Sequence, residues 1–207
     1  MPVQLPEQFN DVQVQRQQLL SAVEMILPDH KNLIDNVLAL AESSHTGQVR
    51  DDGQVYVIHP IRVTRTLLEE MGVRDPQMIA AALLHDVVED TPTTLEEIHE
   101  LFGREIAQLV DSVTRPRANT ESEIDKLTTK PKNYQKILNA PLETVRIKAA
   151  DILDNMRNWV VAEDVVRANG KLPRWLNEAN QWYLPIGKMA GYDIQEQMQE
   201  IVAYFEA

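Results

Sequence analysis

An apolar helical run that ends in a cluster of ionisable side chains constrains this chain more than any other feature. Residues 78–84 are all apolar, and the six residues that follow hold one histidine and three carboxylates. These four are His85, Asp86, Glu89 and Asp90. Asp75-Pro76, before the run, is typical of an N-cap with proline at the first helical position. The pattern predicts a buried helix over residues 75–90 that carries polar groups into the interior.

Two interpretations of this cluster are open. On a helix, His85 and Glu89 lie on one face, and so do Asp86 and Asp90. Burying a carboxylate without a partner is costly, so an opposite charge or a metal ion is expected beside it. For an isolated His-Asp pair, the simpler interpretation is favoured, in which the helix leaves the core and the four residues form its solvated last turn. Partners elsewhere in the chain therefore decide between the two.

The composition favours helices. The chain has 207 residues, enough for one domain with a substantial core, and 43% of them are hydrophobic. It holds only 7 glycines and is rich in Leu, Ala, Glu and Gln, which are mostly strong helix formers. We predict an all-α helical bundle in a single domain over residues 1–207. Its motif-bearing core covers about residues 30–160, and C-terminal helices at 160–207 pack on it.

The net charge and the absence of cysteine limit the classes of ligand and the cellular location that are expected. The net charge of −12 argues against a general nucleic-acid binder, although local cations and a metal ion still allow a small anionic ligand. The absence of cysteine excludes disulfides and cysteinyl zinc sites and fits a cytoplasmic location. The N-terminus lacks the features of a signal peptide, and no apolar run reaches about 18 residues, so no membrane span is expected.

Apolar periodicity and turn residues divide the rest of the chain. Further helices are predicted over residues 7–27, 29–44, 60–71, 94–102, 104–113 and 141–159, with two more between 160 and 207. The polar stretch 44–60 is predicted to be a loop that leaves His59 at a helix start. Taken alone, His59 is more often a simple cap and Arg50 a solvated loop residue. Residues 114–133, the most basic part, are predicted to form a mobile surface loop, with a phosphate-contacting lid as the alternative.

The predicted helix at 141–159 carries a second polar face. Asp151 and Asn155 lie one turn apart on the same side, and Lys148 lies one turn before Asp151. An amphipathic helix with a polar stripe explains this face equally well. Together with the first cluster, however, it gives two imidazoles and two carboxylates. His59, His85, Asp86 and Asp151 form a mixed nitrogen–oxygen set that suits Mn²⁺, Fe²⁺ or another first-row divalent ion with open positions.

Four sequence motifs resemble those of a known protein family. They are His-x-x-Gln-x-Arg at 45–50, Tyr-x-x-His-Pro at 56–60, Ala-Leu-Leu-His-Asp-Val-Val-Glu-Asp-Thr at 82–91, and Lys-x-Ala-Asp-x-x-x-Asn-x-Arg at 148–157. The chain resembles the HD superfamily of metal-dependent phosphohydrolases. The closer resemblance is to the hydrolase domain of RelA/SpoT-type alarmone enzymes and to the small alarmone hydrolases. It covers about residues 30–160.

The resemblance implies a fold, a reaction and a set of residue roles. It implies an all-α HD-domain bundle that removes the 3′-pyrophosphate of (p)ppGpp, usually with Mn²⁺, to give GDP or GTP and pyrophosphate in the stringent response. It implies metal ligation by His59, His85, Asp86 and Asp151, and catalysis by the acidic pair Glu89 and Asp90. It implies substrate binding by Arg50, which contacts the base, by Asn155, and by Lys148 and Arg157 in support of the pocket. With no synthetase region before the end at Ala207, we expect a stand-alone hydrolase.

Two departures from the family pattern leave the substrate open. Asp51 and Ile152 stand where the family usually has basic residues. Either lysines of the basic segment (Lys126, Lys130 or Lys132) compensate for them, or the preferred nucleotide differs. The alternatives are an HD phosphohydrolase acting on NADPH or a nucleoside phosphate, and a non-catalytic nucleotide-sensing module. The sensing module is the weakest of these, because every metal ligand and the Glu89-Asp90 pair are present.

Overall fold

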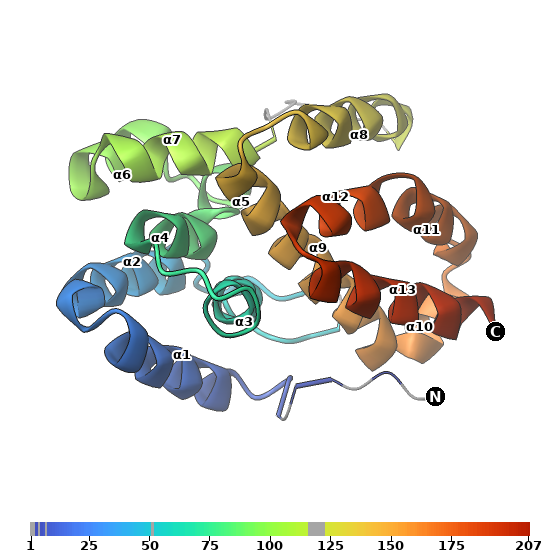
Figure 1. The fold of residues 1–207 in the computed structure, drawn as a ribbon, viewed down its shortest axis with the longest axis horizontal. Helices are drawn as coiled ribbons and strands as arrows, with labels where there is room; N and C mark the ends of the chain where they lie inside the picture. The colour runs from blue at the N-terminus through green and yellow to red at the C-terminus, as the bar shows by residue number, and fades with distance from the viewer. Residues whose placement is uncertain (1–2, 4, 7, 51, 116–122) are drawn as a thin grey trace. The chain divides into compact units, whose positions relative to one another are not determined.

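The fold is helical throughout the part of the chain that can be described. The computed structural model describes residues 3, 5–6, 8–50, 52–115 and 123–207, without the side chains of 123–129. Within these ranges it contains helices and one isolated β-bridge, and no strand. The prediction of an all-α fold is therefore confirmed (Figure 1). Contacts within the chain define two compact units, Pro6–Pro116 and Met1–Leu5 with Arg117–Ala207, so the single domain stays a prediction.

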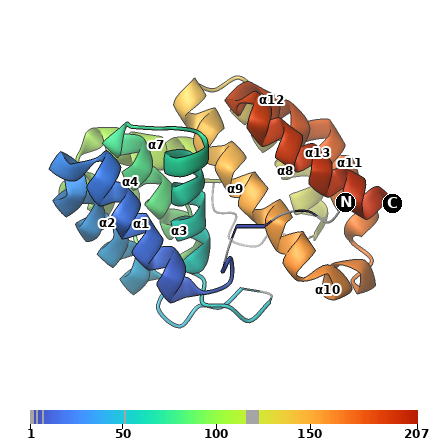
Figure 2. The same ribbon diagram turned by 60° about the horizontal axis from the view of Figure 1, so that its bottom comes forward.

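The unit Pro6–Pro116 is built around one buried helix, α4 (Pro76–Leu84). Its other helices are α1 (Val12–Ile26), η1 (Pro28–His30), α2 (Lys31–Ser44), α3 (Ile58–Arg65), η2 (Thr66–Glu70), α5 (Val87–Asp90), α6 (Leu95–Phe102) and α7 (Arg104–Val113). Helix α4 packs against α2, α3 and α7, and α1 packs against α3. Figure 2 shows α1 to α4 lying side by side.

Local sequence signals set the ends of several helices in this unit. The Asp75 side chain accepts hydrogen bonds from the N–H groups of Gln77 and Met78, as expected of an N-cap. The seven apolar residues after it are at most 4% exposed. Thr94 and Glu97 form the capping box that opens α6. These signals explain why α4 begins where the sequence predicts and why it is buried.

The predicted continuous helix over 75–90 is wrong at one point, because α4 ends at Leu84 and α5 begins only at Val87. The His85 ring Nδ1 donates a hydrogen bond to the Ala82 carbonyl, 2.8 Å away. In a continuous α-helix that carbonyl accepts the N–H of Asp86. The side chain thus competes with the helical bond, and the chain turns at His85-Asp86.

Two other regions differ from the predictions, namely the start of α3 and the basic segment 114–133. Helix α3 begins at Ile58 rather than Pro60, which places His59 inside the first helical turn. Helix α8 (Glu123–Leu138) occupies much of the predicted loop 114–133, where Pro131 and the lysines mask the helical pattern. Residues 116–122 and Asp51 lie outside the described residues, as does the Lys126 side chain.

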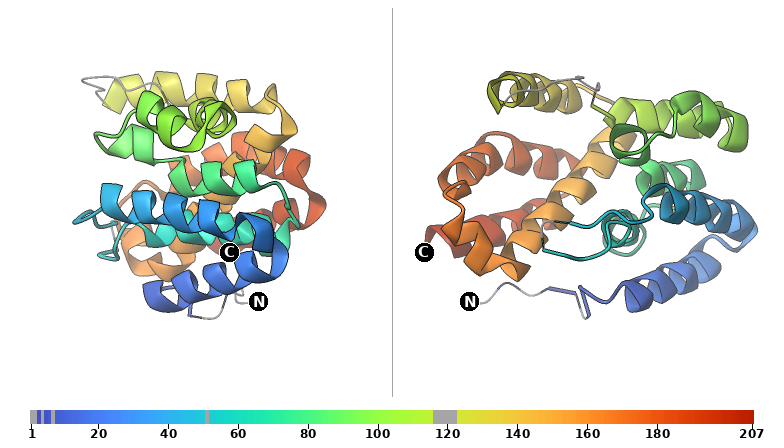
Figure 3. Two further views of the ribbon diagram at one scale, coloured as in Figure 1. Left: turned by 90° about the vertical axis from the view of Figure 1, so that its left-hand side faces the viewer. Right: turned by 180° about the vertical axis from the view of Figure 1, so that it is seen from behind.

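The second unit contains α8 and a cluster of helices around α9 (Leu142–Val161). The predicted pair of C-terminal helices is in fact a series: α10 (Glu163–Ala168), α11 (Leu172–Glu178), η3 (Ala179–Tyr183), α12 (Leu184–Ala190) and α13 (Tyr192–Glu206). Helices α12 and α13 pack on α9 and on each other (Figure 3). A Cβ atom at Gly187 would lie 2.7 Å from the Met198 sulfur, so a larger residue here would force the Met198 side chain to shift. Aromatic rings fill the cluster, as Trp159 stacks on Trp175.

Candidate metal and nucleotide site

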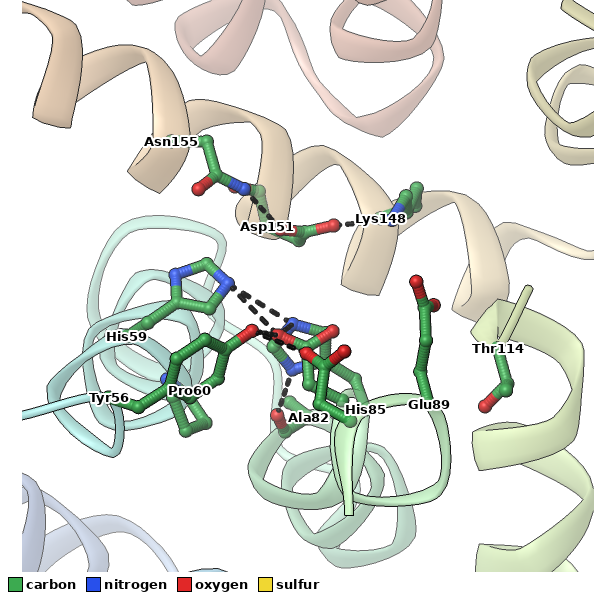
Figure 4. A network of polar contacts seen from close by, with 12 residues as sticks. Tyr56, His59, Pro60, Ala82, His85, Glu89, Thr114, Lys148, Asp151 and Asn155 are labelled. Atoms are coloured by element: carbon green, nitrogen blue, oxygen red, sulfur yellow. Dashed lines mark hydrogen bonds and ion pairs between the residues drawn. The ribbon is translucent and has the colours of Figure 1, made fainter. Parts of the chain in front are cut away.

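Two histidines and one aspartate converge in the unit Pro6–Pro116. His59 lies in α3, and His85 follows α4. Their Nε2 atoms are 3.3 Å apart, and Asp86 Oδ2 lies 3.2 Å from His85 Nε2 and 3.5 Å from His59 Nε2. Both imidazoles are 2% exposed, whereas the Asp86 side chain is 16% exposed. Figure 4 shows the two rings pointing toward each other. The cluster is therefore a buried set of donor atoms and not a solvated helix end.

These donor atoms fit a divalent metal ion. Ligands about 2.1 Å from one ion lie about 3.0 to 3.4 Å apart at octahedral or tetrahedral angles, which is close to the separations found here. Because a carbonyl only accepts, the bond to Ala82 fixes a proton on His85 Nδ1. In the neutral ring, Nε2 then carries a lone pair that faces His59. This orientation by a hydrogen bond on the far nitrogen is the usual arrangement of a metal-binding imidazole.

Tyr56 connects Asp86 of the histidine–aspartate cluster with Asp90 of the acidic pair through hydrogen bonds. Its hydroxyl oxygen lies 2.7 Å from Asp86 Oδ2 and 2.8 Å from Asp90 Oδ2. Its ring stacks on His45, with centroids 4.6 Å apart, and meets the edge of His59. One phenol proton therefore serves two carboxylates. Tyr56 belongs to the Tyr-x-x-His-Pro motif, but its position in the sequence predicts no role for it.

Burial and like charge shift the protonation of this group. Burial, with the negative charges of Asp86 and Asp90, raises the pKa of Tyr56 far above its ordinary value, so the phenol stays neutral and can donate. Partial burial, followed by the charge of Asp86, raises the pKa of Asp90. A proton retained on Asp90 would supply the second donor at the Tyr56 oxygen. Burial lowers the pKa of His45 despite its bond to Gln48.

Glu89, the other member of the acidic pair, has a cationic partner. Arg115 donates to Glu89 Oε1 through Nη2, and its main-chain N–H lies 3.3 Å from Glu89 Oε2. The Glu89 side chain is 18% exposed and that of Arg115 is 46% exposed. Arg115 follows Thr114, the C-terminal cap of α7. Its role was also missed from the sequence, because 26 residues separate the two partners.

Arg50 lies in a short hairpin of the 44–60 loop. Val49 and Val55 form an isolated antiparallel bridge, and the Arg50 N–H donates to the Gln54 carbonyl. The Arg50 guanidinium carbon is 6.0 Å from the centroid of the Tyr56 ring. The hairpin is held near α5 because Gln48 Nε2 donates to the Asp90 carbonyl. The structure thus brings Arg50 close to Tyr56, and its contact with a base stays a prediction.

Helix α9, in the second unit, holds the other predicted site residues. Asp151 is 5% exposed, and its carboxylate accepts bonds from Lys148 Nζ at 2.5 Å and Asn155 Nδ2 at 2.7 Å (Figure 4). Lys148 and Asn155 therefore orient Asp151, which adds to the substrate roles predicted for them. Arg157, 5% exposed, donates to Gln197 of α13. Ile152 belongs to the buried face of α9.

A buried histidine–aspartate cluster on a helical fold is the arrangement expected of an HD domain. Comparison with known families gives the same result. The profile of the HD domain family matches residues 37–172. The chain therefore belongs to the HD-domain family. HD domains bind a divalent metal ion, and His59, His85 and Asp86 are suitable donors for one.

Individual relatives narrow the resemblance. The chain is 34% identical over 178 residues to a guanosine-3′,5′-bis(diphosphate) 3′-pyrophosphohydrolase of Aquifex aeolicus, covering 84% of this chain and 24% of that protein. It is 36% identical over 145 residues to the bifunctional (p)ppGpp synthase/hydrolase SpoT of Escherichia coli, covering 65% of this chain and 19% of that protein. It thus spans about a quarter or less of the length of these two relatives.

A solved structure matches over nearly its whole length. It is a metazoan ortholog of SpoT that hydrolyses ppGpp, with a TM-score of 0.67, 26% identity, and coverage of 83% of this chain and 94% of that one. The resemblance to RelA/SpoT-type hydrolases predicted from the motifs is confirmed. None of the helices in the described ranges is both long and apolar enough to cross a membrane.

Proposed function

We propose that this chain is a metal-dependent (p)ppGpp 3′-pyrophosphohydrolase that yields GDP or GTP and pyrophosphate. The convergence of His59, His85 and Asp86 within 3.5 Å carries this proposal. Relatives with both synthase and hydrolase activities match over only part of their length, so their names alone leave either activity open. The metazoan neighbour, matched over 94% of its chain, supports hydrolysis.

The metal ion is proposed to be Mn²⁺, held by His59, His85, Asp86 and Asp151. The first three already converge, and the mixed nitrogen–oxygen set suits a first-row ion with open positions. Asp151 is a suitable fourth ligand because Lys148 fixes the orientation of its carboxylate. A bound ion supplies a water of lowered pKa and polarises the phosphoryl oxygen.

The acidic pair is proposed to move the protons. Glu89 takes a proton from the attacking water, whose oxygen bonds to the phosphorus next to the 3′-oxygen. The bond between that phosphorus and the 3′-oxygen breaks, and the 3′-oxygen leaves with a proton from Asp90. The raised pKa of Asp90 supports its role as the acid. Arg50 binds the base, and Asn155, Lys148 and Arg157 complete the nucleotide pocket.

Product analysis with a nucleotide panel tests this function. The purified protein, loaded with Mn²⁺, is incubated with ppGpp, pppGpp, NADPH and nucleoside monophosphates, and the released phosphate species are identified. We expect pyrophosphate and GDP from ppGpp. Release of orthophosphate alone from ppGpp would refute the mechanism, and selective turnover of NADPH would identify a different nucleotide substrate. Nucleotide binding without any turnover would indicate a sensing module.

The proposed setting follows from the substrate. A soluble nucleotide substrate and a chain without cysteine support a cytoplasmic location. The net charge of −12 supports a small-molecule ligand rather than a nucleic acid.

A further inference from the structure

The ion pair between Glu89 and Arg115 occupies the carboxylate that is proposed to activate water. Both of its oxygens face donors of one residue, Oε1 the guanidinium and Oε2 the main-chain N–H of Arg115. A carboxylate held in this way is well oriented, and two of its about four lone-pair positions are engaged. Exchange of the guanidinium contact would free Glu89 Oε1 to accept a proton from water.

Arg115 is suited to such an exchange. Its guanidinium presents five N–H donors in a planar fork that matches phosphate oxygens as well as a carboxylate. Its side chain is 46% exposed, so an incoming anion can reach it, whereas Glu89 is 18% exposed. The residue lies directly after α7, and its main-chain N–H holds it beside α5. It is thus a cation held within reach of the acidic pair.

We propose that Arg115 binds the pyrophosphate group of the substrate and, in doing so, releases Glu89. This inference rests on the proposed function and identifies a cationic residue for the same site. In the free protein the guanidinium pairs with Glu89. When the more highly charged pyrophosphate enters, the guanidinium transfers to its oxygens and keeps an anionic partner throughout. The freed Glu89 carboxylate then faces the water, so substrate binding and activation of the base are coupled.

A purely structural role for Arg115 predicts a different pattern. If Arg115 only holds Glu89 in place, its removal lowers kcat, leaves the binding of pyrophosphate unchanged, and shows no coupling with Glu89 in binding. If it exchanges partners, its removal weakens the binding of pyrophosphate. Removal of the Glu89 charge then strengthens binding, but only while Arg115 is present. Double-mutant cycles separate these cases.

Calorimetric titration of the Mn²⁺-loaded protein with inorganic pyrophosphate is the test. We compare wild type, Arg115→Gln, Glu89→Gln and the double variant, with Arg104→Gln as control. Arg104 is an exposed residue at the start of α7, so this control removes one positive charge near the opposite end of that helix from Arg115. Arg115→Gln is expected to weaken binding about tenfold, and Glu89→Gln to tighten it about threefold, as for charge pairs at binding sites. The double variant should bind as weakly as Arg115→Gln, and Arg104→Gln should bind as wild type does.

Two outcomes would overturn the proposal. One is unchanged pyrophosphate affinity in Arg115→Gln, and the other is equal tightening by Glu89→Gln with and without Arg115. Arg115→Lys, which keeps the charge, should restore part of the affinity and guards against a folding defect. Steady-state kinetics with ppGpp should show KM rising more than kcat falls in Arg115→Gln. If ppGpp is not hydrolysed at all, the proposed function fails, while the titration still reads the Arg115 site independently.

Discussion

Two aspartates of the candidate site are held in opposite ways. The Asp86 carboxylate accepts a hydrogen bond from the neutral phenol of Tyr56 and lies against two imidazoles. The Asp151 carboxylate, in α9, accepts hydrogen bonds from the ammonium group of Lys148 and from the side-chain amide of Asn155. The Lys148 charge offsets that of Asp151 before any ion binds, whereas the phenol and the two imidazoles named beside Asp86 carry no permanent positive charge. The comparison suggests that the α4–α5 segment depends more strongly on the metal ion for charge balance than α9 does.

The largest effect is expected from removing the Asp86 carboxylate. Asp86→Ala takes away a proposed ligand and leaves the two imidazoles, so metal affinity should fall by more than about 100-fold, beyond the loss typical of groups that only orient ligands. Hydrolysis of ppGpp should fall to background. Metal content after gel filtration, measured by elemental analysis, checks this. Full metal occupancy in the variant would exclude Asp86 as a ligand.

Glu89 should separate the metal from the chemistry. Glu89→Gln keeps the shape of the side chain and an acceptor oxygen but removes the proposed base. We expect metal affinity to stay near that of wild type and kcat to fall by about 10² to 10⁴, the usual contribution of a general base. Parallel metal titration and kinetics provide the measurement. A metal-loaded variant with full activity would remove Glu89 from the proposed mechanism.

Conservative changes at Tyr56 and Lys148 should act in opposite directions on the metal. Tyr56→Phe keeps the ring but loses the donor to Asp86, so metal affinity should fall about tenfold. Lys148→Met removes a positive charge from Asp151, while Asn155 still orients the carboxylate. Relief of repulsion with the ion should then tighten metal binding by about threefold.

Competition with a fluorescent chelator measures both affinities. Tyr192→Phe serves as the control for Tyr56→Phe, because Tyr192 is 73% exposed and lies in α13. Weaker metal binding in Lys148→Met would contradict the contrast, and would mean that Lys148 acts on the metal chiefly by orienting Asp151.

The sequence predicted best what local patterns determine. Asp75 and the apolar run after it fixed the start and burial of α4, and the His-Asp order identified the cluster. The break after α4 could not be predicted, because it depends on the His85 ring reaching a carbonyl of its own helix. The contacts of Tyr56 with two carboxylates, and of Arg115 with Glu89, join residues 26 or more positions apart. Only tertiary packing determines such pairs.

The smallest effect concerns pH and the metal-free protein. The raised pKa of Asp90 means that the native state holds a proton at pH values where the unfolded chain, with an ordinary carboxyl near 3.9, has lost it. This term therefore increases the free energy of unfolding as pH falls through the folded pKa. The charged and polar groups that act on the Asp90 carboxyl are Asp86, Tyr56, Glu89 and His45.

Asp90→Asn isolates this term, because asparagine keeps an acceptor for Tyr56 and carries no charge. The variant should be more stable than wild type at pH values above the folded pKa of Asp90, where the wild-type carboxyl is ionised beside Asp86. The difference should shrink as pH falls and Asp90 takes up its proton. Urea unfolding in the presence of a chelator, repeated from pH 8 to about pH 4, measures the difference. A difference that is constant with pH would mean that Asp90 titrates as an ordinary carboxyl. The contrast between Asp86 and Asp151 would then not extend to Asp90.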